Sequence, residues 1–111
     1  MTHGMRTIIY PVTDIARGRA LFRALLGADP YTDKPYYVGF RAGDQEIGLD
    51  PHGHRHGMTG YWHVSDIRAT LQSLLDSGAE AIEDPKDVGQ GRLIASVRDP
   101  DGNIIGLLQS S

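Results

Sequence analysis

Two stretches of the chain carry the hydrophobic spacing of amphipathic helices. The first begins after Asp14, whose carboxylate can cap a helix N-terminus, and ends at Gly27, a residue type that favours a left-handed helix stop. The second runs between Asp66 and Gly78 in the same way. We expect the apolar residues of each stretch to lie broadly on one face, which are Ile15, Leu21, Phe22, Leu25 and Leu26 in the first and Ile67, Leu71, Leu74 and Leu75 in the second. The pattern predicts two helices, the second with the more regular spacing.

Alternating apolar and polar residues follow each predicted helix. In each half two such segments are separated by a turn, which predicts a β-hairpin, at 36–41 with 46–50 and at 93–98 with 104–109. The second turn is Asp99-Pro100-Asp101-Gly102-Asn103, in which Gly102 is expected at a positive φ. One further short strand fits before each hairpin, near Tyr31 and near Ala81-Ile82.

The two halves of the chain repeat a sequence motif. Residues 10–15, Tyr-Pro-Val-Thr-Asp-Ile, match residues 62–67, Trp-His-Val-Ser-Asp-Ile, and each hexamer opens a predicted helix. Each half is therefore predicted to be a β-α-β-β-β module, the first at 5–51 and the second at 59–109. A connector rich in Gly and His joins them at 52–58, and the whole chain, 1–111, is expected to be one domain.

Strand alternation divides the predicted strands into an apolar face and a mixed face. Residues such as Phe40, Leu49 and Trp62 fall on the apolar face, which should pack on the helices. The mixed face suits a concave ligand cup, because Gly48 and Gly106 hold equivalent positions where glycine weakens a strand; a solvated outer face is the alternative. The residues expected to line this cup are Thr7, Ile9, Tyr37, Gly39, Arg41, Gly48, Asp50, Thr59, Tyr61, His63, Ile94, Ser96, Gly106 and Leu108.

Composition narrows the class of protein. Of the residues, 40% are hydrophobic and 23% are charged, and this composition is sufficient for a folded core. A chain of 111 residues is too short for two independent domains. A net charge of −3 without a basic stripe argues against nucleic acid or an anionic membrane as a partner. The chain has no cysteine, so disulfides, thiolate zinc sites and thiol nucleophiles are excluded. It also lacks a membrane-length apolar stretch and a signal peptide, so we expect a cytoplasmic protein.

The repeated Val-[Ser/Thr]-Asp-Ile motif and the Asp-Pro-Asp-Gly-Asn run at 99–103 resemble the vicinal oxygen chelate superfamily. This superfamily includes glyoxalase I, bleomycin-resistance proteins and extradiol dioxygenases, and the resemblance extends from Met5 to Gln109. It implies an α+β fold in which two tandem βαβββ modules form a curved mixed sheet with helices on its convex face. It also implies a homodimer with ligand cups between modules. The superfamily hosts many chemistries and some pure binders, so the fold alone does not identify the function.

Metal-using members of this superfamily take ligands from the first and the last strand of each module. By the resemblance, the four ligand positions map to Thr7, Gly48, Thr59 and Gly106. These residues offer neither imidazole nor carboxylate, and a divalent cation needs several such donors. We therefore predict no metal at these positions, and we expect no other cofactor.

The histidines are candidates for other chemistry. His52, His54 and His56 alternate in the connector, where they could form a zinc or nickel cluster or simply belong to a polar linker. His63 is expected to point into the cup, where it could donate a hydrogen bond to a ligand or act as a general base. A structural histidine bonded to the backbone fits the same position.

Two arginines, Arg41 and Arg98, hold equivalent positions at the ends of matching strands. Each could bind a carboxylate of a ligand. Each could equally pair with an acidic residue of the protein, such as Asp50, Asp99 or Glu46. The sequence leaves both possibilities open.

The hypothesis that these residues favour is a metal-independent small-molecule-binding protein of the bleomycin-resistance type. Its cup would sequester an aromatic natural product or antibiotic by stacking on Tyr37 and Tyr61, with polar contacts from Arg41, His63 and Ser96. This function requires no catalytic residue. The first alternative is a glyoxalase- or dioxygenase-like lyase, isomerase or oxygenase that uses a non-standard metal site or His63 as a base. The second is a vestigial cup in a module that serves association only.

Overall fold

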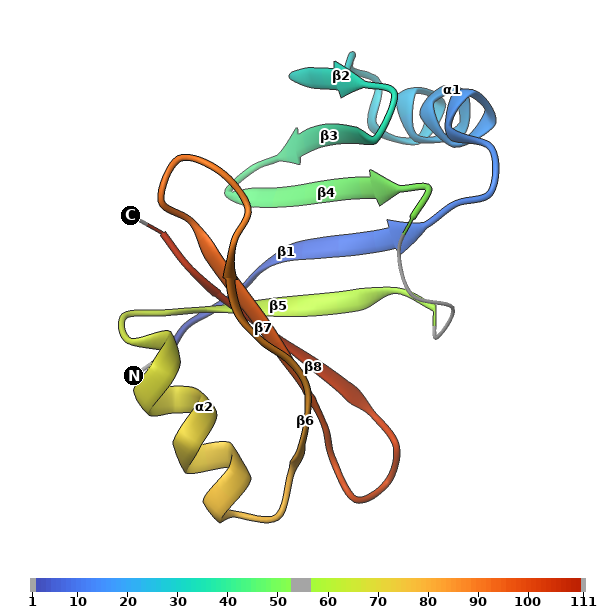
Figure 1. Ribbon diagram of the computed structural model, residues 1–111. Coiled ribbons are helices and arrows are strands. Elements are labelled where there is room, and N and C mark those ends of the chain that lie inside the picture. Colours follow the sequence, from blue (N-terminus) through green and yellow to red (C-terminus); the bar gives the residue numbers. More distant parts are fainter. Residues whose placement is uncertain (1, 53–56, 111) are drawn as a thin grey trace. The chain divides into compact units, whose positions relative to one another are not determined.

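The computed structural model describes residues 2–52 and 57–110. Its helices and strands follow the order β-α-β-β-β twice (Figure 1). The chain forms two compact units, one of residues 6–59 and the other of residues from Gly60 onward together with the start of the chain up to Met5. The α+β class and the repeated module predicted from the sequence are confirmed.

The first unit is a four-stranded mixed sheet with one helix. Its strands lie in the order β2-β3-β4-β1, in which β1 and β4 are parallel and the other neighbours are antiparallel. The elements are β1 (Thr2–Pro11), α1 (Ile15–Leu26), β2 (Thr32–Lys34), β3 (Tyr37–Ala42) and β4 (Gln45–Asp50). The short strand after Tyr31 and the β3–β4 hairpin lie where the sequence predicts them.

The second unit repeats this arrangement. Its strands lie in the order β5-β8-β7-β6, with β5 and β8 parallel. The elements are β5 (Thr59–Val64), α2 (Ile67–Asp76), β6 (Glu80–Asp87), β7 (Leu93–Arg98) and β8 (Ile104–Gln109). The start of β1 lies with this unit, where the Thr2 hydroxyl donates a hydrogen bond of 3.2 Å to the carbonyl of His63. Gly102 in the β7–β8 turn has the predicted positive φ, 89°.

Both helices begin and end as the sequence predicts. The Oδ1 atoms of Asp14 and Asp66 each accept a hydrogen bond of 3.1 Å from the backbone N–H three residues on. Gly27 ends α1 with a φ of 66°, and Gly78 follows the end of α2 with a φ of 106°. The aspartate of the repeated motif is therefore a helix cap in each module.

Each helix covers one face of its own sheet with apolar side chains. The buried side chains of the first unit, and those packed on them, are Val38, Phe40 and Leu49 with Tyr10, Val12, Ile15, Phe22, Leu26 and Ile47. The buried cluster of the second unit consists of Val64, Ile67, Leu71, Ala95, Val97 and Leu107. Burial of these side chains is the main favourable term in folding, and it confirms the apolar face predicted from alternation.

Two apolar residues of α1 do not lie on the buried face, so this part of the prediction is wrong. Leu21 and Leu25, expected on the buried face, keep 64% and 74% of their surface exposed. The buried face of α1 is formed instead by Ile15, Phe22 and Leu26. Gly18 is buried at the edge of this face, where a Cβ would lie 3.2 Å from Cγ1 of Val12 and 3.3 Å from Cδ1 of Leu49. At about 100° per residue, Leu21 lies about 100° and Leu25 about 60° around the helix from Phe22, on the side away from Ile15 and Leu26, so both leucines point outward.

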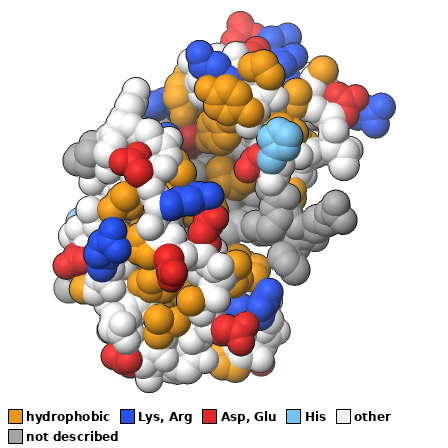
Figure 2. All heavy atoms as spheres, in the orientation of Figure 1, with side chains coloured by type: hydrophobic (Ala, Val, Ile, Leu, Met, Phe, Trp, Pro, Cys, Tyr) orange, Lys and Arg blue, Asp and Glu red, His pale blue; other side chains and the backbone are white. Residues whose placement is uncertain are grey.

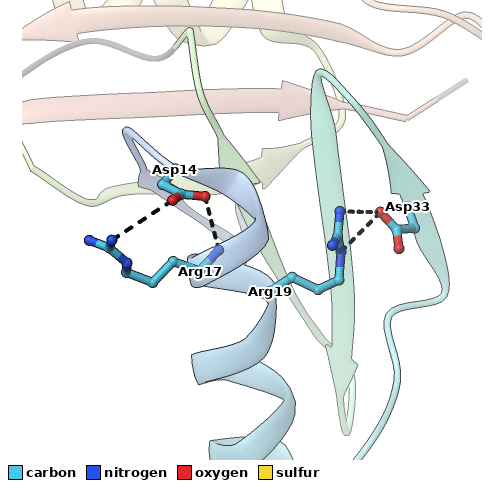
Figure 3. Close-up of polar contacts among 4 residues, drawn as sticks. All are labelled: Asp14, Arg17, Arg19 and Asp33. Carbon is cyan, nitrogen blue, oxygen red and sulfur yellow. Dashed lines mark hydrogen bonds and ion pairs between the residues drawn. The ribbon is translucent and has the colours of Figure 1, made fainter.

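An ion pair fastens the edge of the first sheet to its helix (Figure 3). Nη2 of Arg19 in α1 lies 3.0 Å from Oδ1 of Asp33 in β2. Asp33 points to the helix side of this short edge strand, so its neighbours Thr32 and Lys34 point to the opposite face. That opposite face is where the sequence predicts the ligand cup.

The outermost strand of the second sheet, β6, is irregular. Its pairing with β7 shifts register between Ala81 and Glu83 and again between Glu83 and Lys86, and the strand contains Pro85. Nζ of Lys86 lies 2.8 Å from Oε2 of Glu83. Bulges, a proline and charged side chains are features that keep an edge strand from pairing with another sheet.

Charged side chains of both signs are interspersed on the face shown in Figure 2, with hydrophobic side chains exposed between them. That face carries no large basic area of the kind that binds nucleic acid. Within residues 2–52 and 57–110, neither helix is long and apolar enough to cross a membrane.

Candidate functional site: tyrosine rings on glycines

On the first sheet, the face opposite α1 is built around a tyrosine ring that lies on a glycine. A Cβ on Gly48 of β4 would lie 2.6 Å from Cε1 of Tyr37 and 2.6 Å from Cδ1 of Ile9. Real side chains do not approach so closely, so only glycine leaves room for both neighbours. The sequence assigns Tyr37, Gly48 and Ile9 to one face, and the structure brings them into contact.

The second sheet has a matching arrangement. Tyr61 of β5 covers Gly106 of β8, its register partner, where a Cβ would lie 2.6 Å from Cδ2 of the ring. On the other side of Gly106 its partner is Ser96 of β7, which is buried. In each module a tyrosine ring therefore covers the glycine to which the resemblance maps a last-strand metal ligand.

The remaining predicted residues of the second face lie next to this pair. Leu108 of β8 has Ile94 and His63 as its register partners on the two sides. Leu108 is buried, and Ile94 and His63 are half-buried. The second face is thus largely apolar around its tyrosine.

Glu46 joins the first face although the sequence analysis does not include it among the site residues. Its Oε2 accepts a hydrogen bond of 2.5 Å from the hydroxyl of Tyr37, and the side chain is half-buried. Thr7 of β1, which is buried, is the register partner of Glu46. The alternation that places Gly48 and Asp50 on this face applies equally to Glu46, so the signal was present in the sequence.

A second tyrosine and an arginine complete the first face. A Cβ on Gly39 of β3 would lie 2.9 Å from Cε1 of Tyr31 and 3.0 Å from Cε2 of Tyr37, so both rings meet over this glycine. Cζ of Arg41 lies over the ring of Tyr31, 4.3 Å from its centroid. Tyr31 precedes β2, so strand alternation gave no signal for it.

One predicted cup residue and one candidate arginine have structural partners. Oδ1 of Asp50 accepts a hydrogen bond of 2.8 Å from the backbone N–H of His52, which holds the turn after β4. Nη1 of Arg98 lies 3.1 Å from Oε1 of Glu80 in β6. Of the two equivalent arginines, Arg98 therefore has an acidic partner in the protein, and Arg41 has an aromatic one.

The four positions that the resemblance maps to metal ligands do not fit that role. Thr7 and Thr59 are buried, with one hydroxyl each, and Gly48 and Gly106 have no side chain and lie under tyrosine rings. Proteins hold divalent cations with several imidazole, thiolate or carboxylate groups at once. Among the described residues, no three His, Asp or Glu side chains lie close enough together to hold a metal ion.

Two further predictions concern the connector and Trp62. Of the connector histidines, His52 is described and its side chain is exposed, whereas His54 and His56 lie outside the described residues. The predicted histidine cluster therefore stays a prediction. Trp62, expected against a helix, keeps 36% of its surface exposed and is not part of the cluster buried under α2.

Comparison with known proteins gives one match to a family. A model of the Glyoxalase/Bleomycin resistance protein/Dioxygenase superfamily matches residues 4–107. No curated protein sequence matches the chain.

Solved structures share the fold at low sequence identity. A glyoxalase/bleomycin resistance protein/dioxygenase superfamily member from Vibrio splendidus 12B01 is 17% identical, with a TM-score of 0.73 over 99% of this chain and 100% of that one. Methylmalonyl-CoA epimerase from Mycobacterium tuberculosis is 16% identical, with a TM-score of 0.79 over 99% of this chain and 89% of that one. A chain described as NAD-dependent benzaldehyde dehydrogenase from Legionella pneumophila is 18% identical, with a TM-score of 0.75 over 95% of this chain and 98% of that one. At these identities the similarity establishes the fold and not the activity.

Proposed function

Because the chain belongs to the Glyoxalase/Bleomycin resistance protein/Dioxygenase superfamily, we propose that it is a metal-independent binding protein of the bleomycin-resistance type. Its ligand is a small planar molecule, such as an aromatic natural product or antibiotic, that lies against the tyrosine-bearing face of a sheet. The protein holds this molecule by stacking and shape and releases it unchanged. It does so as a homodimer in the cytoplasm.

The observation that carries this proposal is the pair of tyrosine rings that lie on Gly48 and Gly106. Planar ligands stack on aromatic faces, and stacking needs no metal. In the first unit the ring of Tyr37 is held at its edge by Gly39 and Gly48 and at its hydroxyl by Glu46. A ring that is already held in place loses little conformational entropy when a ligand stacks on it, which favours binding.

Thermal unfolding in the presence of a panel of planar natural products tests the proposal. At least one compound is expected to raise the Tm, and the rise should be the same with and without EDTA, because a tight ligand stabilises the folded state. Tyr37→Leu removes the stacking surface and should weaken binding of that compound by about tenfold or more. The neighbouring Tyr36→Leu, at an exposed tyrosine, is the matched control and should leave the affinity unchanged.

Three results would count against this function. Absence of a Tm shift with every compound would remove the binding role. A shift that EDTA abolishes would show that binding depends on a metal. Equal affinity of the Tyr37→Leu variant and the wild type, at unchanged stability, would show that the ligand lies elsewhere.

The hydrogen bond between Tyr37 and Glu46 favours a second candidate function, an isomerase that moves a proton without a metal. A half-buried carboxylate beside a phenol supplies the proton acceptor and the proton donor that such a reaction needs. The shared fold with methylmalonyl-CoA epimerase suggests an acyl-CoA thioester as the substrate to try. His63 on the second face is the alternative base.

Hydrogen exchange tests this second function. The protein is incubated with methylmalonyl-CoA in D2O, and loss of the α-hydrogen is followed by proton NMR. If Glu46 is the base, Glu46→Gln abolishes exchange and His63→Gln does not, and the reverse result assigns the role to His63. Absence of exchange above the rate without protein would reject the epimerase reading.

A further inference from the structure

Arg41 stands at the end of β3 on the same face as Tyr37 and Gly39. Its side chain is exposed, and its guanidinium lies over the ring of Tyr31. Tyr31 and Tyr37 both contact the space above Gly39, so the cation stands at the edge of an aromatic surface made of two rings. Charge and aromatic surface thus lie side by side in one compact unit.

Arg41 has no acidic partner among the described residues, unlike most arginines around it. Three arginines of the same unit form ion pairs, which are Arg17 with Asp14, Arg19 with Asp33 and Arg23 with Asp29. Arg98, at the equivalent position in the second module, pairs with Glu80. Within the described residues, no carboxylate lies within ion-pair distance of Arg41.

The nearest candidate partner along the sheet is otherwise engaged. Glu46 is the register partner of Arg41 on β4, so the two side chains leave the sheet on the same face. The Glu46 carboxylate nevertheless accepts its hydrogen bond from Tyr37, and the Arg41 guanidinium lies over Tyr31. Each of the two opposite charges therefore has a tyrosine as its partner, and they do not form an ion pair with each other.

A guanidinium over an aromatic ring keeps its hydrogen-bonding capacity. The ring attracts the cation through its face, whereas the N–H donors of the guanidinium radiate in its own plane. These donors form a fork that matches a carboxylate or a phosphate in two parallel hydrogen bonds. Arg41 therefore offers an anion site beside the stacking surface.

We propose that the ligand of the first sheet face is a planar aromatic anion, whose ring stacks on Tyr37 and whose carboxylate or phosphate binds Arg41. This inference rests on the proposed binding function and adds the chemical class of the ligand. It also gives the two modules different roles. Arg98 pairs with Glu80, so the second face is not expected to bind an anion.

Matched pairs of planar acids and their primary amides test the charge preference. The probes are naphthalene-2-carboxylate, anthraquinone-2-carboxylate and phenazine-1-carboxylate, each with its carboxamide. Dissociation constants are measured by calorimetry at neutral pH, and the site is located from backbone chemical-shift changes at Gly39 and Gly48. For at least one pair the acid is expected to bind about tenfold more tightly than the amide, because one good charge-assisted contact is worth about that factor.

Arginine variants assign the preference to one side chain. Arg41→Gln should bring the affinity for the acid down to that for the amide, because the cation that binds the carboxylate is lost. Arg98→Gln is the matched control at the equivalent position and should change neither affinity. Arg41 is exposed, and an unchanged Tm and NMR spectrum would show that the Arg41→Gln variant is folded.

Failure of this inference can be told apart from failure of the binding function. Equal binding of acid and amide at Gly39 and Gly48, or an acid preference that survives in Arg41→Gln, would overturn the anion site and leave the binding role intact. Absence of binding by every acid and amide would overturn both. Raised salt should weaken binding of the acid and not of the amide, because ions screen the charge.

Discussion

At the scale of single residues, the candidate site depends on what glycine lacks. Gly48 and Gly106 have ordinary strand conformations, so they are not needed for a turn. Their missing Cβ atoms leave the space in which the rings of Tyr37 and Tyr61 lie. Glycine lowers the stability of a strand, but here it makes room for a flat aromatic ring at the same position in both modules.

Gly48→Ala is expected to destabilise the protein by about 1–3 kcal/mol, because the new methyl group forces Tyr37 off the sheet and away from Glu46. The penalty should fall in a Tyr37→Ala background, where the ring is absent, and urea unfolding of the four proteins in this double-mutant cycle measures the difference. Gly60→Ala is the control: a Cβ there meets only the flexible side chain of Met5, so it should cost less. Additive effects of Gly48→Ala and Tyr37→Ala would show that the two residues do not interact.

Asp99 gives a prediction about pH. Its pKa is lowered from the ordinary value of 3.8, chiefly by the hydrogen bond from the Asn103 side chain and then by backbone N–H groups of the same turn. A group whose pKa is lowered by folding stabilises the protein above its ordinary pKa, and this stabilisation is lost as the pH falls through the lowered value. Asp99→Asn should therefore lower the free energy of unfolding at neutral pH. The difference from the wild type should shrink as the pH falls below 3.8; a constant difference at every pH would contradict the assignment.

At the residue scale, the sequence was enough to predict which strand residues share a face, but not the contacts between their side chains. Alternation was enough to place Tyr37 and Gly48 on one face, because side-chain direction in a strand depends only on position. It could not show that Tyr37 binds Glu46 or that Arg41 lies over Tyr31, because these contacts depend on rotamers and on a residue outside any strand. The partner of each arginine was open for the same reason.

At the scale of elements, the repeated motif acts through its aspartate. Asp14 and Asp66 both cap a helix, and each helix covers one four-stranded sheet. Hairpins and caps could be predicted because they depend on local sequence. The buried face of α1 could not, because it is set by the packing of Phe22 on the sheet, and Leu21 and Leu25 lie roughly 60–100° around the helix from Phe22.

Removal of either cap should cost a similar amount. Asp14→Ala and Asp66→Ala are each expected to lower the free energy of unfolding by about 1 kcal/mol, because a backbone N–H of the first helical turn loses its acceptor. Asn keeps the acceptor, so Asp14→Asn and Asp66→Asn should be close to the wild type. Urea unfolding provides the measurement. Equal losses in the Ala and Asn variants would show that charge, and not the cap, is responsible.

At the scale of the whole molecule, each module is a complete version of the same plan. Each unit has one sheet, one helix and a tyrosine ring on the glycine of its last strand, and the differences lie in the side chains around that ring. The first unit adds Glu46 and Arg41, and the second adds Ser96 and Leu108. One repeated plan therefore presents two faces of different polarity.

The resemblance in sequence leads us to expect a homodimer, which sedimentation velocity can test. The sedimenting species should have twice the 12.1 kDa mass of the chain, and the dimer should persist on dilution through the micromolar range. A ligand that binds only the dimer would shift the equilibrium toward it by mass action. A species of 12.1 kDa at all concentrations, with and without ligand, would contradict the expectation.

The irregular edge strand β6 affects the tendency of the protein to form fibrils at high concentration. A fibril grows when a further chain pairs with an exposed edge strand in register, so that its backbone N–H and C=O groups all form hydrogen bonds. On β6 the spacing breaks at Glu83 and again before Lys86, and Pro85 has no N–H to offer. An incoming chain can therefore form only a few consecutive backbone hydrogen bonds with β6, so fibril growth from this edge should stop early.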